Sequence, residues 1–460
     1  MTAASWPLHA RSAVLAPNHG TRLVVWTTHA FLAVAPFLYF AQVLLWRNDF
    51  VPIPYLLLLL AYLVATWARN HVDPMYTTSV SFLDLLVGYM VGMNIAWTAF
   101  EAFTLGPVNA LRVLTYFVTP GLIYFYVSRR FEFRDSERAL KILAWTAVAV
   151  AAELAYERYW NLVLFEPAPF QVRNLGYVAV LGSGDELLQL ATVGYRSPGM
   201  LEHLHATAVF IGLGAVIWTS WYLARGKVQN LVMAILMLSA LVLTGARTVL
   251  ASAIAALVIL GFGGVFARGG KVGKRLLVPL VLMGTAAGYL MFFSPLVSEI
   301  YAPLLTGEPL GHVSFWGVIV PEEIGIWAQQ MRDLPLAIPF GLGPAPDSWR
   351  NSLGISSDDF FVIDMVSRYG IIGATVFYLL VPAMLIGTLR RLRVSGTEPE
   401  KMMFIQCAAM AFLLMGTTIH SGAIMRKSVF PWLFVFLGIA RSLTVRGVVR
   451  PSAARGGEGA

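Results

Sequence analysis

Long uninterrupted blocks of apolar residues, separated by short polar segments, dominate the pattern of this 460-residue chain. A helix needs about 20 mostly apolar residues to cross the hydrocarbon core of a membrane. About twelve blocks approach this length, and they lack the alternation of apolar and polar residues that strands of a membrane barrel show. The pattern therefore predicts an all-α fold, a polytopic membrane bundle of about 12 transmembrane helices.

A long polar segment, residues 294–359, separates the ninth predicted span from the tenth. It holds eight of the chain's 24 prolines, so no spanning helix fits inside it. The predicted division is a terminal segment 1–22, spans one to nine within 23–293, the loop 294–359, spans ten to twelve within 360–440, and a tail 441–460. The predicted spans are Leu23–Trp46, Ile53–Trp67, Val80–Trp97, Leu111–Val127, Ala139–Ala155, Ala206–Leu223, Leu231–Leu243, Val249–Phe266, Leu276–Phe293, Phe360–Leu385, Met402–Ile419 and Ser428–Ile439.

The composition agrees with the pattern. The chain is 58% hydrophobic and only 13% charged, whereas soluble domains are about half apolar and about a quarter charged. An ordinary water-exposed surface is therefore excluded. The single cysteine, Cys407, lies in an apolar block and can form no internal disulfide.

Basic residues set the expected orientation. The segments that follow every second span carry most of them, and basic residues are enriched in cytoplasmic loops. We therefore expect both termini to be cytoplasmic and the loop 294–359 to lie outside. This reading accounts for the net charge of +8 without nucleic acid. The basic residues left outside are all arginine except Lys427, which favours recognition of phosphate, because the guanidinium binds it with two parallel hydrogen bonds. The alternative is that each arginine pairs with a nearby acid.

Charged residues beside a membrane are costly and therefore mark candidate sites. Asp364 and Arg368 lie four residues apart on one helix face and are expected to pair. On the same outer side lie Arg196, Arg247, His420 and Arg426. The phosphate-loop, nucleophile-elbow and zinc-helix motifs of soluble enzymes are absent from the sequence.

Four features occur in a fixed order: Arg196 before a middle helix, a T-x-[SA]-R turn at Thr244–Arg247, a P-x-G-x-G segment at Pro339–Gly343, and a helix carrying Gly370 and Gly373. With these, the middle of the chain resembles the O-antigen ligase and polysaccharide polymerase family, membrane glycosyltransferases of the GT-C type. The first five spans resemble the family only in being hydrophobic.

The resemblance implies an enzyme of the bacterial inner membrane. It would move a glycan from an undecaprenyl-diphosphate donor to a glycan acceptor at the periplasmic face, without a metal or other cofactor. Arg196 and Arg247 match the family's diphosphate-binding positions, and Arg332 and Arg426 are added from their position in the sequence. Membrane lipids and other components of polysaccharide export are the further expected partners; nucleic acid is not.

Two positions depart from the family pattern. The ligases carry a histidine eleven residues before the first glycine, where this chain has Asp359; a carboxylate can also accept the proton of a hydroxyl. His420 is the second candidate base. A loop arginine of the family is replaced by Glu323. These departures favour a polymerase of exopolysaccharide repeat units over a ligase acting on lipid A–core. A transporter of lipid-linked sugars is the alternative from another class.

Overall fold

The computed structural model of the protein describes part of the chain. The described residues are 25–26, 28–34, 80–104, 106–160, 204–268, 324–325, 328–329, 332, 335–344, 361–392, 397–418 and 429–446. Within these ranges the regular structure is helical throughout and no strand occurs. The prediction of an all-α fold is therefore confirmed for the described part of the chain.

The described helices are joined by turns in some places and are separated by residues outside the described ranges in others. In chain order they are α3 (Phe82–Thr104), α4 (Pro107–Val113), the π-helical η3 (Leu114–Val118), α5 (Thr119–Arg130), α6 (Phe133–Trp160), α9 (Leu204–Arg225), α10 (Val228–Leu243), α11 (Arg247–Arg268), α16 (Ala337–Phe340), α18 (Phe361–Leu392), α19 (Glu398–Thr417) and α20 (Phe430–Arg446). Apart from α16, which falls within the predicted loop 294–359, they overlap the third to eighth and the tenth to twelfth predicted spans.

Five of these helices are long and apolar enough to cross a membrane. Their spanning parts are Phe82–Thr104, Phe133–Tyr156, His205–Arg225, Thr248–Val265 and Val362–Gly387. α10 and α20 contain shorter apolar stretches. The second and ninth predicted spans, and most of the first and of the loop 294–359, lie outside the described residues. The protein is thus a helical protein with several membrane-spanning candidates, and the number twelve stays a prediction.

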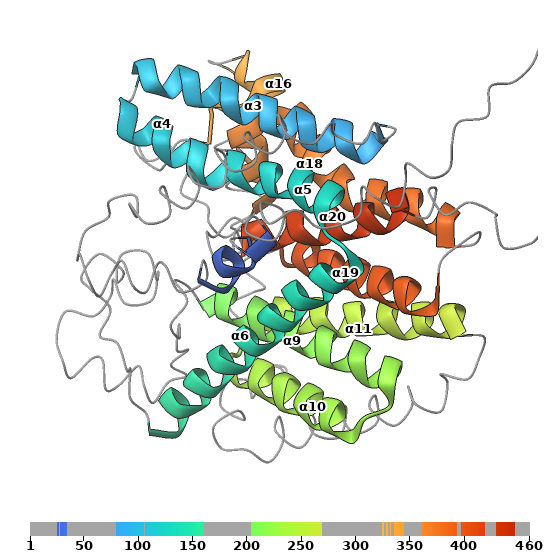
Figure 1. Ribbon diagram of the computed structural model, residues 1–460. Coiled ribbons are helices and arrows are strands. Elements are labelled where there is room, and N and C mark those ends of the chain that lie inside the picture. The colour runs from blue at the N-terminus through green and yellow to red at the C-terminus, as the bar shows by residue number, and fades with distance from the viewer. Residues whose placement is uncertain are drawn as a thin grey trace, which may run out of the picture.

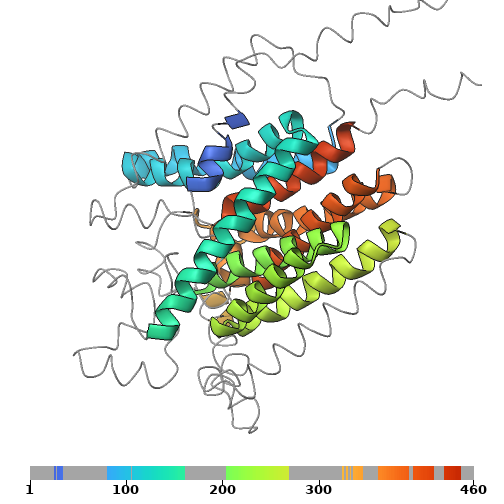
Figure 2. The same ribbon diagram turned by 60° about the horizontal axis from the view of Figure 1, so that its bottom comes forward.

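α9 forms the centre of one part of the bundle. It packs against α6, α10, α11 and α19, while α19 also contacts α20, and α20 runs along α5. α3 lies at the opposite edge from α10, where it contacts α4, α5 and α18 (Figures 1 and 2). Within the most apolar stretch of each helix, 94% of the α9 residues are buried inside the bundle but only 28% of the α3 residues. α3 therefore presents most of its apolar surface outward.

Small residues bring the helices close together. A Cβ added at Gly214 of α9 would lie 2.6 Å from the Cβ of Ala147 on α6, and one at Gly438 of α20 would lie 2.9 Å from the side chain of Val127 on α5. Close approach through glycine and alanine is how helices associate where lipid removes the hydrophobic drive between them.

The turn between α10 and α11 shows how the sequence ends one helix and starts the next. Gly245 has a φ of 69°, which favours glycine. The Thr244 hydroxyl donates to the Leu241 carbonyl at 2.6 Å and accepts from the Ala246 amide at 3.1 Å. α11 then begins at Arg247. The predicted turn around Arg247 is confirmed.

Candidate functional site

α18 is broken near its start, at Gly370. The backbone there has φ 67° and ψ 179°, a conformation that is essentially restricted to glycine. A break leaves the last carbonyls of the first segment without partners in their own helix. The Ser367 carbonyl accepts a hydrogen bond from the Leu342 amide at 2.7 Å, and the Arg368 carbonyl accepts one from the Gly343 amide at 3.0 Å. The segment after α16 thus caps the broken helix.

Glycines on both sides make this approach possible. A Cβ at Gly341, where φ is 80°, would lie 2.2 Å from the Arg368 carbonyl oxygen. A Cβ at Gly370 would lie 2.2 Å from the Pro339 carbonyl oxygen. Each side chain would overlap with the backbone of the other segment, so only a glycine pair permits this contact.

An ion pair lies beside the break. The Arg368 Nε donates to the two carboxylate oxygens of Asp364 at 3.0 and 2.8 Å. The side chains are 13% and 5% exposed. Arg368 Nη1 also donates to the Pro344 carbonyl at 3.4 Å. The predicted pairing of Asp364 with Arg368 is confirmed, and the guanidinium also reaches the loop that caps the helix.

α3 also packs against the cluster formed by the break at Gly370, the segment after α16 and the Asp364–Arg368 pair. The Tyr369 hydroxyl donates to the Asn94 side-chain oxygen at 3.1 Å, and both residues are buried. Trp97 packs so closely on the loop that a Cβ at Gly343 would lie 2.8 Å from its ring. Glu101, one turn further along α3, is 1% exposed. A carboxylate in a spanning helix is a candidate functional group.

An open groove of about 520 Å³ runs along the outward face of α3 next to this cluster. Phe340 of α16 borders it. Six residues of α3 line it with helical spacing, so they share one face: Tyr89, Gly92, Met93, Ala96, Trp97 and Phe100. The groove is within the roughly 300–1,000 Å³ range of small-molecule sites, and its lining suits an apolar ligand.

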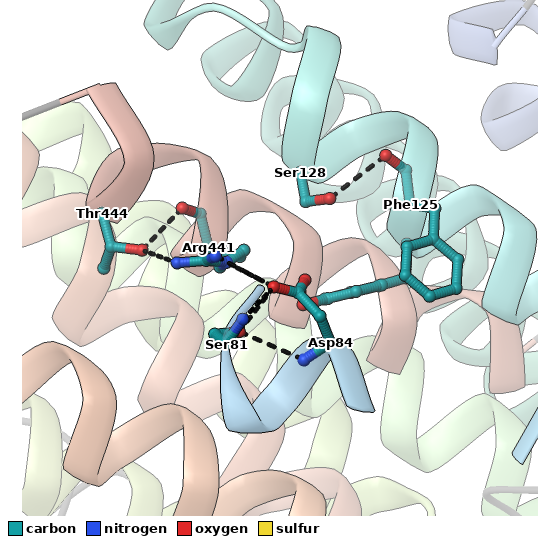
Figure 3. A network of polar contacts seen from close by, with 7 residues as sticks. Ser81, Asp84, Phe125, Ser128, Arg441 and Thr444 are labelled. Atoms are coloured by element: carbon teal, nitrogen blue, oxygen red, sulfur yellow. Dashed lines mark hydrogen bonds and ion pairs between the residues drawn. The ribbon is translucent and has the colours of Figure 1, made fainter. Parts of the chain in front are cut away.

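A second ion pair lies at the other end of α3. Arg441 of α20 donates from Nε and Nη2 to Asp84 Oδ2 at 3.1 and 2.9 Å. The Ser81 hydroxyl and the Tyr124 hydroxyl of α5 also donate to this carboxylate, both at 2.7 Å. Figure 3 shows Arg441 pointing toward Asp84, with Thr444 on the far side of Arg441. Three helices are joined at one carboxylate, which indicates a structural contact.

The structure describes only part of the site predicted from the sequence. Arg247 is the first residue of α11, and Arg332 is exposed. The remaining predicted residues lie outside the described part of the chain: Arg196, Asp359, His420 and Arg426. Their roles in binding and catalysis stay predictions.

Several contacts of the cluster were not predicted. Asn94 is a polar residue inside an apolar block, and this pattern could have been used to predict that its side chain makes a buried polar contact. Gly341 and Gly343 have φ values of 80° and 96°, and the contact of Gly341 with Gly370 was not predicted. Within the described ranges, no three histidine, cysteine or acidic side chains gather as metal ligands would.

The chain was also compared with known proteins. Family models, curated proteins and solved structures gave no match.

Proposed function

We propose that the protein is a membrane glycosyltransferase that polymerises undecaprenyl-diphosphate-linked repeat units of an exported or surface polysaccharide. One observation carries the proposal. The P-x-G-x-G segment and the helix with Gly370 and Gly373, two parts of the family-like pattern, meet through paired main-chain hydrogen bonds beside the Asp364–Arg368 pair.

The charges of the site suit this chemistry. The leaving group of the reaction is a lipid diphosphate, and preorganised positive charge stabilises it as the glycosidic bond breaks. Arg196, Arg247, Arg332 and Arg426 are the proposed diphosphate ligands. Arg368 is added to this set, because Asp364 and the Pro344 carbonyl fix its guanidinium beside the loop.

In the proposed step, the bond between the anomeric carbon and the diphosphate oxygen breaks. The electron pair leaves with the lipid diphosphate, and the acceptor hydroxyl oxygen forms the new bond to the anomeric carbon. The hydroxyl proton passes to a base, for which Asp359 is the first candidate and His420 the second. The reaction balances without a nucleotide sugar.

The test uses the purified full chain in nanodiscs with a lipid-diphosphate-linked repeat unit, and products are sized on a gel. We expect a ladder of multiples that Arg368→Lys and Arg247→Ala abolish. Lysine keeps the charge of residue 368 but cannot make the fork-shaped contacts of arginine. Arg138→Ala is the matched control, because this arginine is 67% exposed on α6, and its ladder should be unchanged.

Other outcomes would assign other functions. A single transfer onto added lipid A–core, without a ladder, would identify a ligase. The broken α18 favours a transporter as the second candidate, because interrupted spanning helices commonly form transport sites. Movement of the lipid-linked sugar across proteoliposomes, with no transfer to any acceptor, would identify that function and overturn the glycosyltransferase.

A further inference from the structure

A cluster of charged side chains lies where the first turns of α6 meet the last turn of α9. One oxygen of Glu137, Oε1, pairs with Nη2 of Arg225 on α9 and, at 3.4 Å, with Nζ of Lys141 one turn along α6. Two cations therefore share one carboxylate. Glu137 is 23% exposed, whereas Lys141 and Arg225 are 48% and 46% exposed. Because the acid is the most buried of the three, the surface that they present is positive.

Arg225 is held from two sides. Its guanidinium pairs with Glu137 and lies over the ring of Trp221, 5.8 Å from the ring centre. A guanidinium fixed in this way presents its donors in a planar fork that matches the oxygens of a phosphate. Lys141 contacts the same oxygen of Glu137, so the two cations lie close enough for one phosphodiester to bridge them.

Tryptophan side chains continue this cluster along the two helices. Trp145, one turn beyond Lys141 on α6, packs edge-on against Trp218 of α9 with 5.6 Å between ring centres. Trp218 packs against Trp221 at 5.0 Å. Trp218 and Trp221 are buried, but Trp145 is 56% exposed. Both helices contain candidate membrane spans, and tryptophan is enriched where such spans cross the boundary between lipid and water.

The distance between the charged and the aromatic level matches the boundary layer of a bilayer. Lys141 and Trp145 are four residues apart, which is a step of about 6 Å along a helix. The layer between the hydrocarbon core and water is about 5–8 Å thick on each side of a membrane. A ligand at this place meets two cations at one level and an exposed aromatic ring one turn deeper. A phospholipid carries its phosphate and its acyl chains in this order.

We infer that Lys141 and Arg225 bind the phosphodiester headgroup of an anionic phospholipid whose acyl chains lie against Trp145. The positive surface selects an anionic headgroup, because a zwitterionic one adds an ammonium group that the two cations repel. A free phosphate or an acidic peptide would use the cations but leave the Trp145 ring without an apolar partner. The inference rests on the contacts between α6 and α9 and is independent of the proposed function.

The test titrates the purified full chain in detergent micelles with phosphatidylglycerol or with phosphatidylcholine of the same acyl chains, and native mass spectrometry counts the bound lipids. We expect a lower Kd for phosphatidylglycerol. Lys141→Gln should raise this Kd roughly fivefold, the effect of one basic residue beside an anionic lipid surface, and Lys141→Arg should keep it. Lys401→Gln is the matched control, because it removes the same charge from α19. Size-exclusion chromatography shows that each variant is folded.

A second variant tests the aromatic level. Trp145→Ala should raise the Kd for phosphatidylglycerol roughly fourfold for each methylene group of the lipid that loses its apolar contact. A ligand held by charge alone would not respond to this change, so Trp145 distinguishes a lipid from other anions.

Three results would overturn the inference. Equal binding of the two lipids, or an equal loss in Lys141→Gln and Lys401→Gln, would show a diffuse positive field without a site. Displacement of phosphatidylglycerol by inorganic phosphate would assign the cations to a free anion. A loss in Lys141→Gln with full binding in Trp145→Ala would leave an acidic segment of a partner protein as the better occupant.

Discussion

Two arginine–carboxylate pairs, near the two ends of α3, have similar burial but different surroundings. Arg441 and Asp84 are each 12% exposed and join α20 to α3 across 357 residues of sequence. Arg368 and Asp364 are 13% and 5% exposed and belong to one helix. The first pair is surrounded by hydroxyl donors from its neighbours. The second lies beside a broken helix, a glycine-rich loop and an open groove.

The difference separates a contact that holds three helices together from one that, in the proposed function, positions a guanidinium for the lipid diphosphate. Asp84 accepts hydrogen bonds from Ser81, Tyr124 and Arg441, so its carboxylate is already satisfied. Arg368 is held by a residue of its own helix and by a loop carbonyl. Two ion pairs with similar burial therefore need not have similar roles, because the groups around each pair differ.

The largest expected effect is on the Asp84 pair. Asp84→Ala leaves the Arg441 guanidinium in a largely buried position without its carboxylate, which costs about 3–5 kcal/mol. Unfolding by SDS titration in mixed micelles, followed by tryptophan fluorescence, measures the loss. A double-mutant cycle with Arg441→Ala that shows no coupling energy would contradict the structural role.

The next effect is on the broken helix. Gly370→Ala forces a non-glycine residue into its backbone conformation, at a cost of about 1–3 kcal/mol. Its Cβ would lie 2.2 Å from the Pro339 carbonyl oxygen and would push the 339–343 segment away from α18. The same titration and the ladder assay measure the losses of stability and transfer. Gly387→Ala in the same helix should lose neither; equal behaviour of the two variants would show that the break is dispensable.

A smaller effect distinguishes the partners of Asp84. Tyr124→Phe removes one hydrogen bond to the carboxylate while Ser81 and Arg441 remain. We expect a loss of about 1–2 kcal/mol in the unfolding free energy, with transfer activity per folded molecule unchanged. A drop in activity without a drop in stability would move this end of the protein into the functional site.

The smallest effect concerns Ser128, which lies near the same pair in Figure 3. Its hydroxyl donates to the Phe125 carbonyl of its own helix at 3.1 Å. Ser128→Ala removes only this local bond, so the unfolding free energy should change by less than about 0.5 kcal/mol. A change as large as that of Tyr124→Phe would show that Ser128 belongs to the network around Asp84.

The sequence was enough to predict the helical fold, because long apolar blocks dictate spanning helices whatever their contacts. It also predicted the Asp364–Arg368 pair, since residues four apart on a helix are neighbours. It did not predict the Asp84–Arg441 pair or the contact of Gly341 with Gly370. These depend on which helices become neighbours in space, and spacing along the chain does not encode that. Predicting the groove would also have required knowing which helices are neighbours in space and that the space beside Gly92 is open.

The main-chain join between the 339–343 segment and α18 bears on how such a protein can diversify. The contact is made by main-chain amides and carbonyls and requires only that Gly341 and Gly370 lack side chains. It therefore places no requirement on the identity of the other side chains in the segment. Side chains elsewhere in the loop can then change freely while the attachment is kept. A loop from a protein with another specificity, carrying the same glycine spacing, should be exchangeable as a cassette.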